Sequence, residues 1–178
     1  MVSKKYTKDY RVEARLTKRG VVCDEAIYCG DYFTFSRPRE DVRRSMWYLS
    51  AAELGIALSI LAPMCFPCAY CRQMYVVLPL VLCLIPVFFL AAALYRVRSA
   101  GEKVIREHRD KIANRFPACA LLQLIGTGLV LIGSVVFVIL GEPDVIDWIF
   151  SALSVLRVAA SVLIFLRRRD FAMEPVSE

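Results

Sequence analysis

The stretch from Phe116 to Gly141 constrains this chain most, because it contains no charged residue. An α-helix rises about 1.5 Å per residue, so about 20 apolar residues cross the roughly 30 Å hydrocarbon core of a bilayer. Strands are much shorter, and helices of soluble proteins keep a polar face. The stretch therefore predicts a membrane-spanning helix.

Three further apolar runs accompany this stretch, and hydrophobic residues make up 58% of the chain. The apolar residues are continuous rather than alternating, which excludes a transmembrane β-barrel. The sequence thus predicts an all-α membrane protein with a four-helix transmembrane bundle. The predicted spans cover about 46–66, 73–95, 117–140 and 145–166. Because the first run begins so late, we expect an uncleaved insertion signal rather than a cleavable signal peptide.

Lysine and arginine total 23, and the net charge is +6. Most of these residues precede the first span, separate the second span from the third, or follow the fourth. The positive-inside rule then places both termini and the middle segment on the cytoplasmic side of a plasma or inner membrane. We expect anionic lipid of the inner leaflet, rather than nucleic acid, to be the partner of this charge.

Residues 1–45 form a basic head that is too polar to cross the membrane. Apolar and polar side chains alternate in its first strand candidate, as in a half-buried strand. The predicted strands are residues 10–16, 21–28 and 32–35, and residues 18–20 form the turn between the first two. A small hairpin or meander is therefore expected, covered by the membrane, the middle segment or a second copy. The alternative for residues 1–45 is a partly ordered basic tail. At the other end of the chain, residues 167–178 are predicted to form a C-terminal tail.

Two pairs of residues predict details of the helices. Pro79 and Pro86 in the second span predict a kink. Gly126 and Gly133 in the third span are seven residues apart and therefore share a face. Small residues on one face let a neighbouring helix approach closely in lipid.

The segment 97–116 keeps apolar side chains at helical spacing, but charged residues surround them. This pattern predicts a separate amphipathic helix that lies on the inner membrane surface or packs on the head. Pro117 suits the first turn of the third span.

Three polar side chains within the predicted spans are candidate functional residues, because polar groups in a membrane are rare: Glu53, Gln123 and Arg157. Gln123 lies at about the depth of Glu53 and could hydrogen-bond to it. We also predict a contact between Glu53 and Arg157, direct or through water. A purely structural pair is the simpler interpretation, and a proton-coupled small carrier that titrates Glu53 is the alternative.

The loop after the first span carries Cys65, Cys68 and Cys71 at C-x2-C-x2-C spacing. A zinc site needs a fourth ligand, and the one histidine, His108, is expected on the other side of the membrane. We therefore expect no metal, although three thiolates could hold an iron–sulfur cluster. A redox pair, a small structural disulfide and free thiols are the other interpretations.

The pattern C-x-x-C-x-Y-x-R of residues 65–72 resembles the outer-face motif of the quinone-linked membrane thiol oxidases that recharge periplasmic disulfide catalysts. Those proteins also have four spans and cytoplasmic termini. The resemblance implies that Cys65 and Cys68 are the redox pair and that Arg72 lies beside a quinone. The chain departs from that family at Cys71, where the family has an acidic residue. It also departs at 141–144, a short loop without the family's second cysteine pair.

The sequence contains no glycine-rich phosphate loop, catalytic-triad spacing or histidine–carboxylate metal set. A non-enzymatic scaffold or accessory protein of the membrane is therefore the simplest function. Its head and middle segment would contact a cytoplasmic protein or a second copy. The alternatives are a thiol oxidoreductase at Cys65 and Cys68, which would use a quinone, and a proton-coupled carrier at Glu53.

Overall fold

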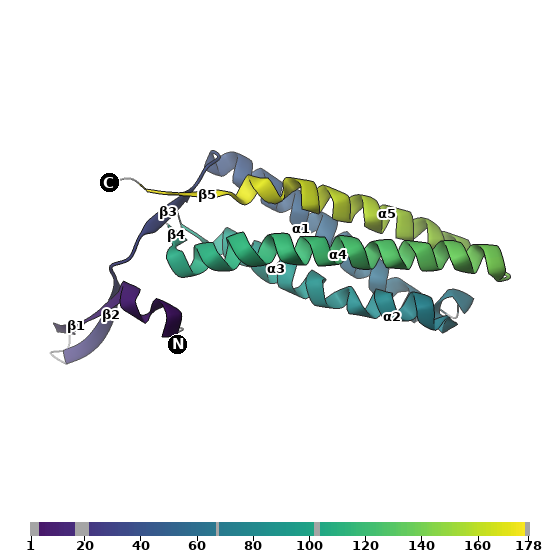
Figure 1. The fold of residues 1–178 in the computed structure, drawn as a ribbon, viewed down its shortest axis with the longest axis horizontal. Helices are drawn as coiled ribbons and strands as arrows, with labels where there is room; N and C mark the ends of the chain where they lie inside the picture. Colours follow the sequence, from purple (N-terminus) through teal and green to yellow (C-terminus); the bar gives the residue numbers. More distant parts are fainter. Residues whose placement is uncertain (1–3, 17–21, 67, 102–103, 177–178) are drawn as a thin grey trace.

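The computed structural model describes residues 4–16, 22–66, 68–101 and 104–176. Long helices lie side by side in an elongated bundle, with small strands at one end (Figure 1). Four helical segments have the length and apolar composition to cross a membrane: Arg39–Cys65, Met74–Ser99, Arg106–Leu140 and Val145–Phe171. The chain is therefore a multi-pass membrane protein with four helical spans, as predicted.

The second span is divided into α2 (Met74–Leu82) and α3 (Leu84–Ser99). The division follows from Pro86, which has no N–H to bond the carbonyl of Leu82 and whose ring clashes with that carbonyl. Pro79, the other proline from which we expected a kink, lies inside α2.

The structure differs from the separate amphipathic helix predicted over 97–116. The first part of that segment ends α3, and the chain leaves the helix before α4 (Arg106–Leu140) begins. α4 then continues without a break through Pro117 into the third span. Its buried side chains Ile112, Phe116 and Ala120 form one inward-facing stripe across the proline, so the amphipathic part and the span are one helix.

The other two spans are α1 (Arg39–Leu61) and α5 (Val145–Arg167). α4 packs against α2, α3 and α5, whereas α1 packs against α3 and α5. The glycines of α4 explain part of this close packing. A Cβ on Gly133 would lie 3.1 Å from the carbonyl oxygen of Tyr75, and one on Gly126 would lie 2.6 Å from Cys83 Sγ. The predicted close approach at these glycines is confirmed, and the neighbour is the second span.

The predicted hairpin is present as β1 (Tyr10–Leu16) and β2 (Val22–Tyr28), which pair antiparallel. A 3-10 turn, Lys4–Asp9, precedes it, and the turn predicted at 18–20 lies outside the described residues. Figure 1 shows the hairpin projecting beyond the end of the bundle.

The third predicted strand, β3 (Tyr32–Phe35), does not extend the hairpin into a meander. It lies between β4 (Val104–Ile105) and β5 (Met173–Pro175), and both pairings are antiparallel. β5 lies in the segment that we expected to be only a tail. We call this end of the bundle the sheet end, and we call the opposite end, with residues 141–144, the loop end.

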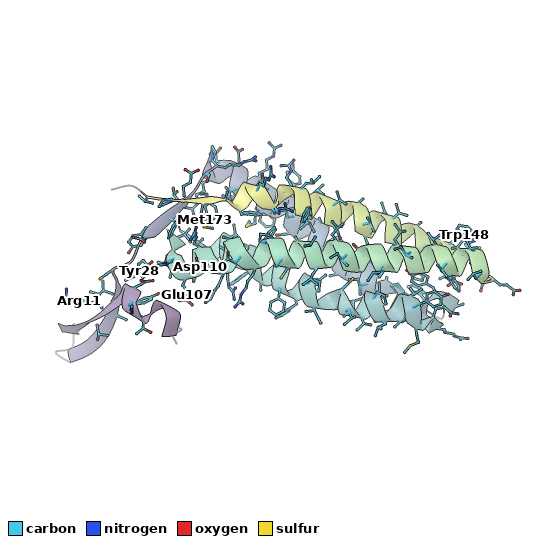
Figure 2. All side chains as sticks on the ribbon, viewed as in Figure 1. Arg11, Tyr28, Glu107, Asp110, Trp148 and Met173 are labelled. Carbon is cyan, nitrogen blue, oxygen red and sulfur yellow. The ribbon has the colours of Figure 1, made fainter. Side chains whose placement is uncertain are left out.

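Tyr28 connects the hairpin to the sheet end, and Figure 2 shows it where the two meet. Its hydroxyl donates to the carbonyl of Asp31 at 2.8 Å and accepts from the backbone N–H of Arg106 at 3.0 Å. Its ring packs edge-on against the rings of Tyr10 and Tyr32. The hairpin is thus held to the start of α4 by its first cross-strand pair.

Candidate functional site

Polar side chains are buried along the interior of the bundle, and we call them the polar seam. On α4 and α5 they recur at intervals of three, four or seven residues, as Gln123, Thr127 and Ser134 illustrate. Side chains at these intervals share one face of a helix, and in both helices that face packs inward. The seam consists of Ser45, Glu53, Gln123, Thr127, Ser134, Asp147, Ser154, Arg157, Ser161 and Asp170.

Glu53 of α1 and Gln123 of α4 meet near the middle of the bundle. Gln123 Nε2 donates to Glu53 Oε2 at 3.0 Å, which confirms the hydrogen bond predicted from their equal depth. Such bonds between helices contribute about 0.6–2 kcal/mol in a membrane. The contact therefore connects α1 to α4, and a proton-coupled role for Glu53 stays a prediction.

Arg157 of α5 does not pair directly with Glu53, so the direct form of the predicted contact is wrong, and a contact through water stays a prediction. Arg157 Nε donates to Ser59 Oγ at 3.0 Å, and Nη2 donates to the Ser59 carbonyl at 3.1 Å. Helical side chains lean toward the N-terminus of their own helix. Because α1 and α5 run in opposite directions, Glu53 leans toward the sheet end and Arg157 toward the loop end, where Ser59 lies.

Arg157 is the buried cation of the seam. Its side chain is 2% exposed, and Nη1 has no hydrogen-bond partner among the described residues. It lines a groove of about 330 Å³ between α1 and α5. A guanidinium remains charged inside a protein, so Arg157 is a buried charge held only by neutral groups.

Tyr70, which belongs to the segment between α1 and α2, hydrogen-bonds to residues of the seam at the loop end. Its side chain is 0% exposed. Its hydroxyl hydrogen-bonds to Ser134 Oγ at 2.8 Å and to Ser154 Oγ at 2.9 Å, and the two serines are 2.9 Å apart. Its ring packs between those of Phe137 and Phe150. Tyr70 therefore connects the segment between α1 and α2 to both α4 and α5.

Asp147 fixes the backbone of the same segment. Its Oδ1 accepts the backbone N–H of Tyr70 at 3.0 Å, and its Oδ2 accepts the N–H of Asp144 at 3.2 Å. The second bond is half of a capping box at the start of α5. One buried carboxylate thus caps a helix and orders the neighbouring loop.

The three loop cysteines are free thiols that differ in exposure: Cys65 is exposed, Cys68 is buried and Cys71 is half-buried. Cys68 and Cys71 both donate to the carbonyl of Pro63, at 3.5 and 3.3 Å, whereas Cys65 is exposed and donates to Leu61. Cys68 and Cys71 therefore share one acceptor, whereas Cys65 and Cys68, the pair implied by the resemblance, do not. Within the described part of the chain, no group of three or more His, Cys, Asp or Glu side chains could hold a metal ion.

Burial, together with the neighbouring Cys68 thiol, raises the pKa of Cys71 to about 12. The thiolate is the reactive form, so we expect Cys71 to react with iodoacetamide about a hundredfold more slowly than exposed Cys65 at about pH 8. The Cys71 rate should increase as the pH rises toward 12. Peptide mapping by mass spectrometry measures both rates, and in detergent-unfolded protein the difference should vanish. Equal rates in the folded protein would contradict the burial of this thiol.

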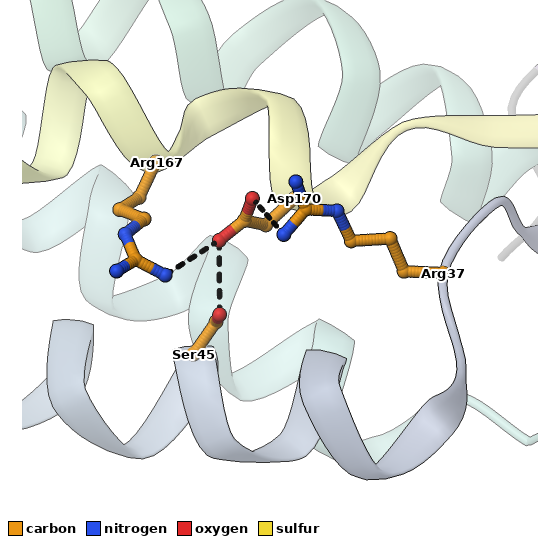
Figure 3. Close-up of polar contacts among 4 residues, drawn as sticks. All are labelled: Arg37, Ser45, Arg167 and Asp170. Atoms are coloured by element: carbon orange, nitrogen blue, oxygen red, sulfur yellow. Dashed lines mark hydrogen bonds and ion pairs between the residues drawn. The ribbon is translucent and has the colours of Figure 1, made fainter.

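Asp170 closes the seam at the sheet end, and sequence analysis did not identify it. It accepts from Arg37 Nη1 at 2.7 Å, Ser45 Oγ at 2.9 Å and Arg167 Nη1 at 3.4 Å (Figure 3). Its side chain is buried, while both arginines are largely exposed. Asp170 thus joins the start of α1 to the end of α5. The sequence feature that could have identified Asp170 is its position directly after three arginines, where an acidic side chain can form ion pairs.

Comparison of the chain with protein-family models, curated proteins and solved structures found no match. The fold and the seam define its class, which is a multi-pass membrane protein with four helical spans and a polar interior. Of the residues predicted to be functional, the structure brings Glu53 together with Gln123, and Cys68 together with Cys71. Arg157 lies apart from them, and Arg72 is exposed at the loop end.

Proposed function

We propose that this chain is a non-enzymatic scaffold or accessory protein of the membrane, which presents the β1–β2 hairpin to a second protein or a second copy. The observation that carries the proposal is the exposure of apolar side chains on a hairpin that projects beyond the bundle. Val12 is 65% exposed, and its cross-strand partner Ala26 is exposed beside it on the same face of the hairpin. Ile27, which is 39% exposed, lies on the opposite face with Arg11. Apolar side chains displayed together outside the bundle are typical of an interaction surface.

The pairing of the hairpin supports the same function. Among the described strands, β1 and β2 pair only with each other. A two-stranded hairpin is marginally stable alone, and an exposed edge strand can pair with another chain. A partner strand or a covering surface would stabilise it.

The interior of the bundle supports a structural role for the spans. Hydrogen bonds of the seam connect α1 to α4 through Glu53 and Gln123, and α4 to α5 through Thr127 and Ser161 at 3.2 Å. Such bonds hold helices together where water is absent. The positive-inside rule places the arginine-rich sheet end in the cytoplasm, so the proposed partner is cytoplasmic.

The test is photo-crosslinking in native membranes with a crosslinking amino acid in place of Val12. We expect a discrete protein adduct, at twice the monomer mass if the partner is a second copy. Val145, which is 77% exposed at the loop end, is the matched control and should not give this adduct. A crosslinker at Ala26, which faces Val12 across the strands, should lose at least about fivefold in yield when Val12→Lys is added, because a charge disfavours an apolar interface. Identical adducts at positions 12 and 145, or none at position 12, would overturn the proposal.

A membrane thiol oxidoreductase is the second candidate, favoured by the shared hydrogen-bond acceptor of Cys68 and Cys71. Forming a disulfide between them would release two protons and two electrons, which a quinone would accept to become a quinol. Trapping of thiols in native membranes, before and after reduction, tests this function. A Cys68–Cys71 disulfide that forms on addition of a quinone would support it, and thiols that stay reduced would exclude it.

A further inference from the structure

We propose that the groove between α1 and α3 at the sheet end binds one glycerophospholipid with an anionic headgroup. The phosphate lies at Arg43 and Arg98, and an acyl chain extends along the groove toward Glu53. This site is separate from the hairpin, and Glu53 is the member of the polar seam that also lines the groove.

The headgroup part is a cavity of about 270 Å³ whose lining includes Arg39, Arg43, Arg98 and Trp47. Arg39 and Arg43 are four residues apart and share a face of α1, while Arg98 comes from α3. Arg39 Nη2 donates to the carbonyl of Ala100 at 3.2 Å, which fixes one wall. Guanidinium groups from two helices therefore face one cavity, and they suit phosphate because they can donate two parallel hydrogen bonds.

Two of the arginines of this cavity, Arg43 and Arg98, have no carboxylate beside them in the part of the chain that the structure describes. In the described ranges, no Asp or Glu side chain lies within 4.0 Å of the guanidinium of Arg43 or Arg98. Glu40 and Asp41 belong to the same turn of α1 but do not line the cavity. An anion is thus the ligand that the cavity complements.

The acyl-chain part is a groove of about 370 Å³ that adjoins the cavity, with Met46, Trp47 and Arg98 lining both. Its other lining residues are mostly apolar and come from α1 and α3, such as Leu54 and Val87. A soluble phosphate compound would use only the cavity, and a neutral lipid would use only the groove. A glycerophospholipid with an anionic headgroup uses both.

The depth of the site agrees with this ligand. Arg43 lies near the start of the first span and Arg98 near the end of the second, where lipid headgroups lie. The Arg98 guanidinium is 5.4 Å from the centre of the Trp47 ring. Tryptophan is enriched at the membrane interface, and a cation over its face is attracted to the ring. Trp47 thus orients Arg98 at headgroup depth.

Trp47 also makes the site measurable, because the chain has only 2 tryptophans and Trp148 lies at the loop end. In the Trp148→Phe variant, the fluorescence of Trp47 is quenched by brominated lipid next to it. We expect brominated phosphatidylglycerol to quench Trp47 several-fold more effectively than brominated phosphatidylcholine in mixed vesicles. A basic side chain beside an anionic headgroup contributes roughly a fivefold preference for that lipid. Quenching of Trp47 reports only the lipid next to it, so an arginine that lines the cavity contributes to the preference and an arginine outside the cavity does not. Arg43→Gln and Arg98→Gln should therefore each remove about that factor.

The matched control is Arg44→Gln, which removes the same charge from the neighbouring position. Arg44 lies 5.9 Å from the Tyr48 ring centre and does not line the cavity. This variant should keep the preference, and Trp148 in a Trp47→Phe variant should show none. Equal loss in the Arg43 and Arg44 variants, or equal quenching by both lipids, would overturn the proposal. Displacement of the quencher by soluble glycerol phosphate would also overturn it, because a soluble anion would then be the ligand.

Discussion

Replacing Tyr70 with alanine is expected to lower the free energy of unfolding by about 3–5 kcal/mol, the range for truncating a buried aromatic side chain. The Tyr70 ring is 0% exposed and packs between two phenylalanines. Its removal leaves a cavity at the loop end and separates the segment between α1 and α2 from α4 and α5. Unfolding in detergent micelles, followed by circular dichroism, measures the change.

Tyr70→Phe is the control, because it keeps the ring and removes only the hydroxyl. Ser134 and Ser154 can each still donate one hydrogen bond, because the carbonyls of Val130 and Phe150 in the same helices and the other serine remain as acceptors. The expected cost is therefore about 1 kcal/mol or less. Equal losses in both variants would show that the hydroxyl, and not the packing, holds the segment in place.

Replacing Arg157 with methionine is expected to raise the free energy of unfolding by about 1–4 kcal/mol, as for other buried charged groups replaced by apolar ones of similar size. Arg157 is buried, and among the described residues its side chain hydrogen-bonds only to the neutral Ser59. Ser59 Oγ also donates to the carbonyl of Ile56, so its hydroxyl stays bonded without Arg157. The same unfolding measurement applies.

Arg157→Lys retains the charge but loses the two hydrogen bonds of the guanidinium, so it should not stabilise the protein. A lower free energy of unfolding in Arg157→Met would contradict the gain expected for that variant. It would show that Arg157 has an anionic partner in the membrane, and the groove between α1 and α5 would be its site. A higher free energy of unfolding in Arg157→Met would mean that the charge of Arg157 lowers stability. Such a cost is typical of charged intramembrane residues that are kept for function.

The features predicted correctly from the sequence are those that depend on residues close together in the chain. The uncharged stretch around Phe116–Gly141 predicts a span because its length matches a bilayer, and the alternation in 10–16 predicts a strand because its period is two. The Glu53–Gln123 bond followed from depth alone, since both residues lie at about the same distance along their helices. Depth alone failed for Arg157, whose long side chain leans toward the opposite end of the bundle.

The features that were missed depend on contacts between distant segments. β4 and β5 contain two and three residues, too few to show a period, and only their pairing with β3 makes them strands. Tyr70 was considered only as a member of a cysteine motif. Its burial depends on Ser134 and Ser154, which are far from it in the sequence and become neighbours only when the helices pack.

The central position of β3 has a consequence for biosynthesis. Phe33 pairs across the sheet with both Val104 and Pro175, so its two neighbours are translated at very different times. The first can arrive once the second span has left the ribosome, whereas the other is synthesised only after all four spans. During translation, an early strand must therefore wait with one edge uncovered, and a chaperone or the translocation machinery has access to it until the last strand arrives.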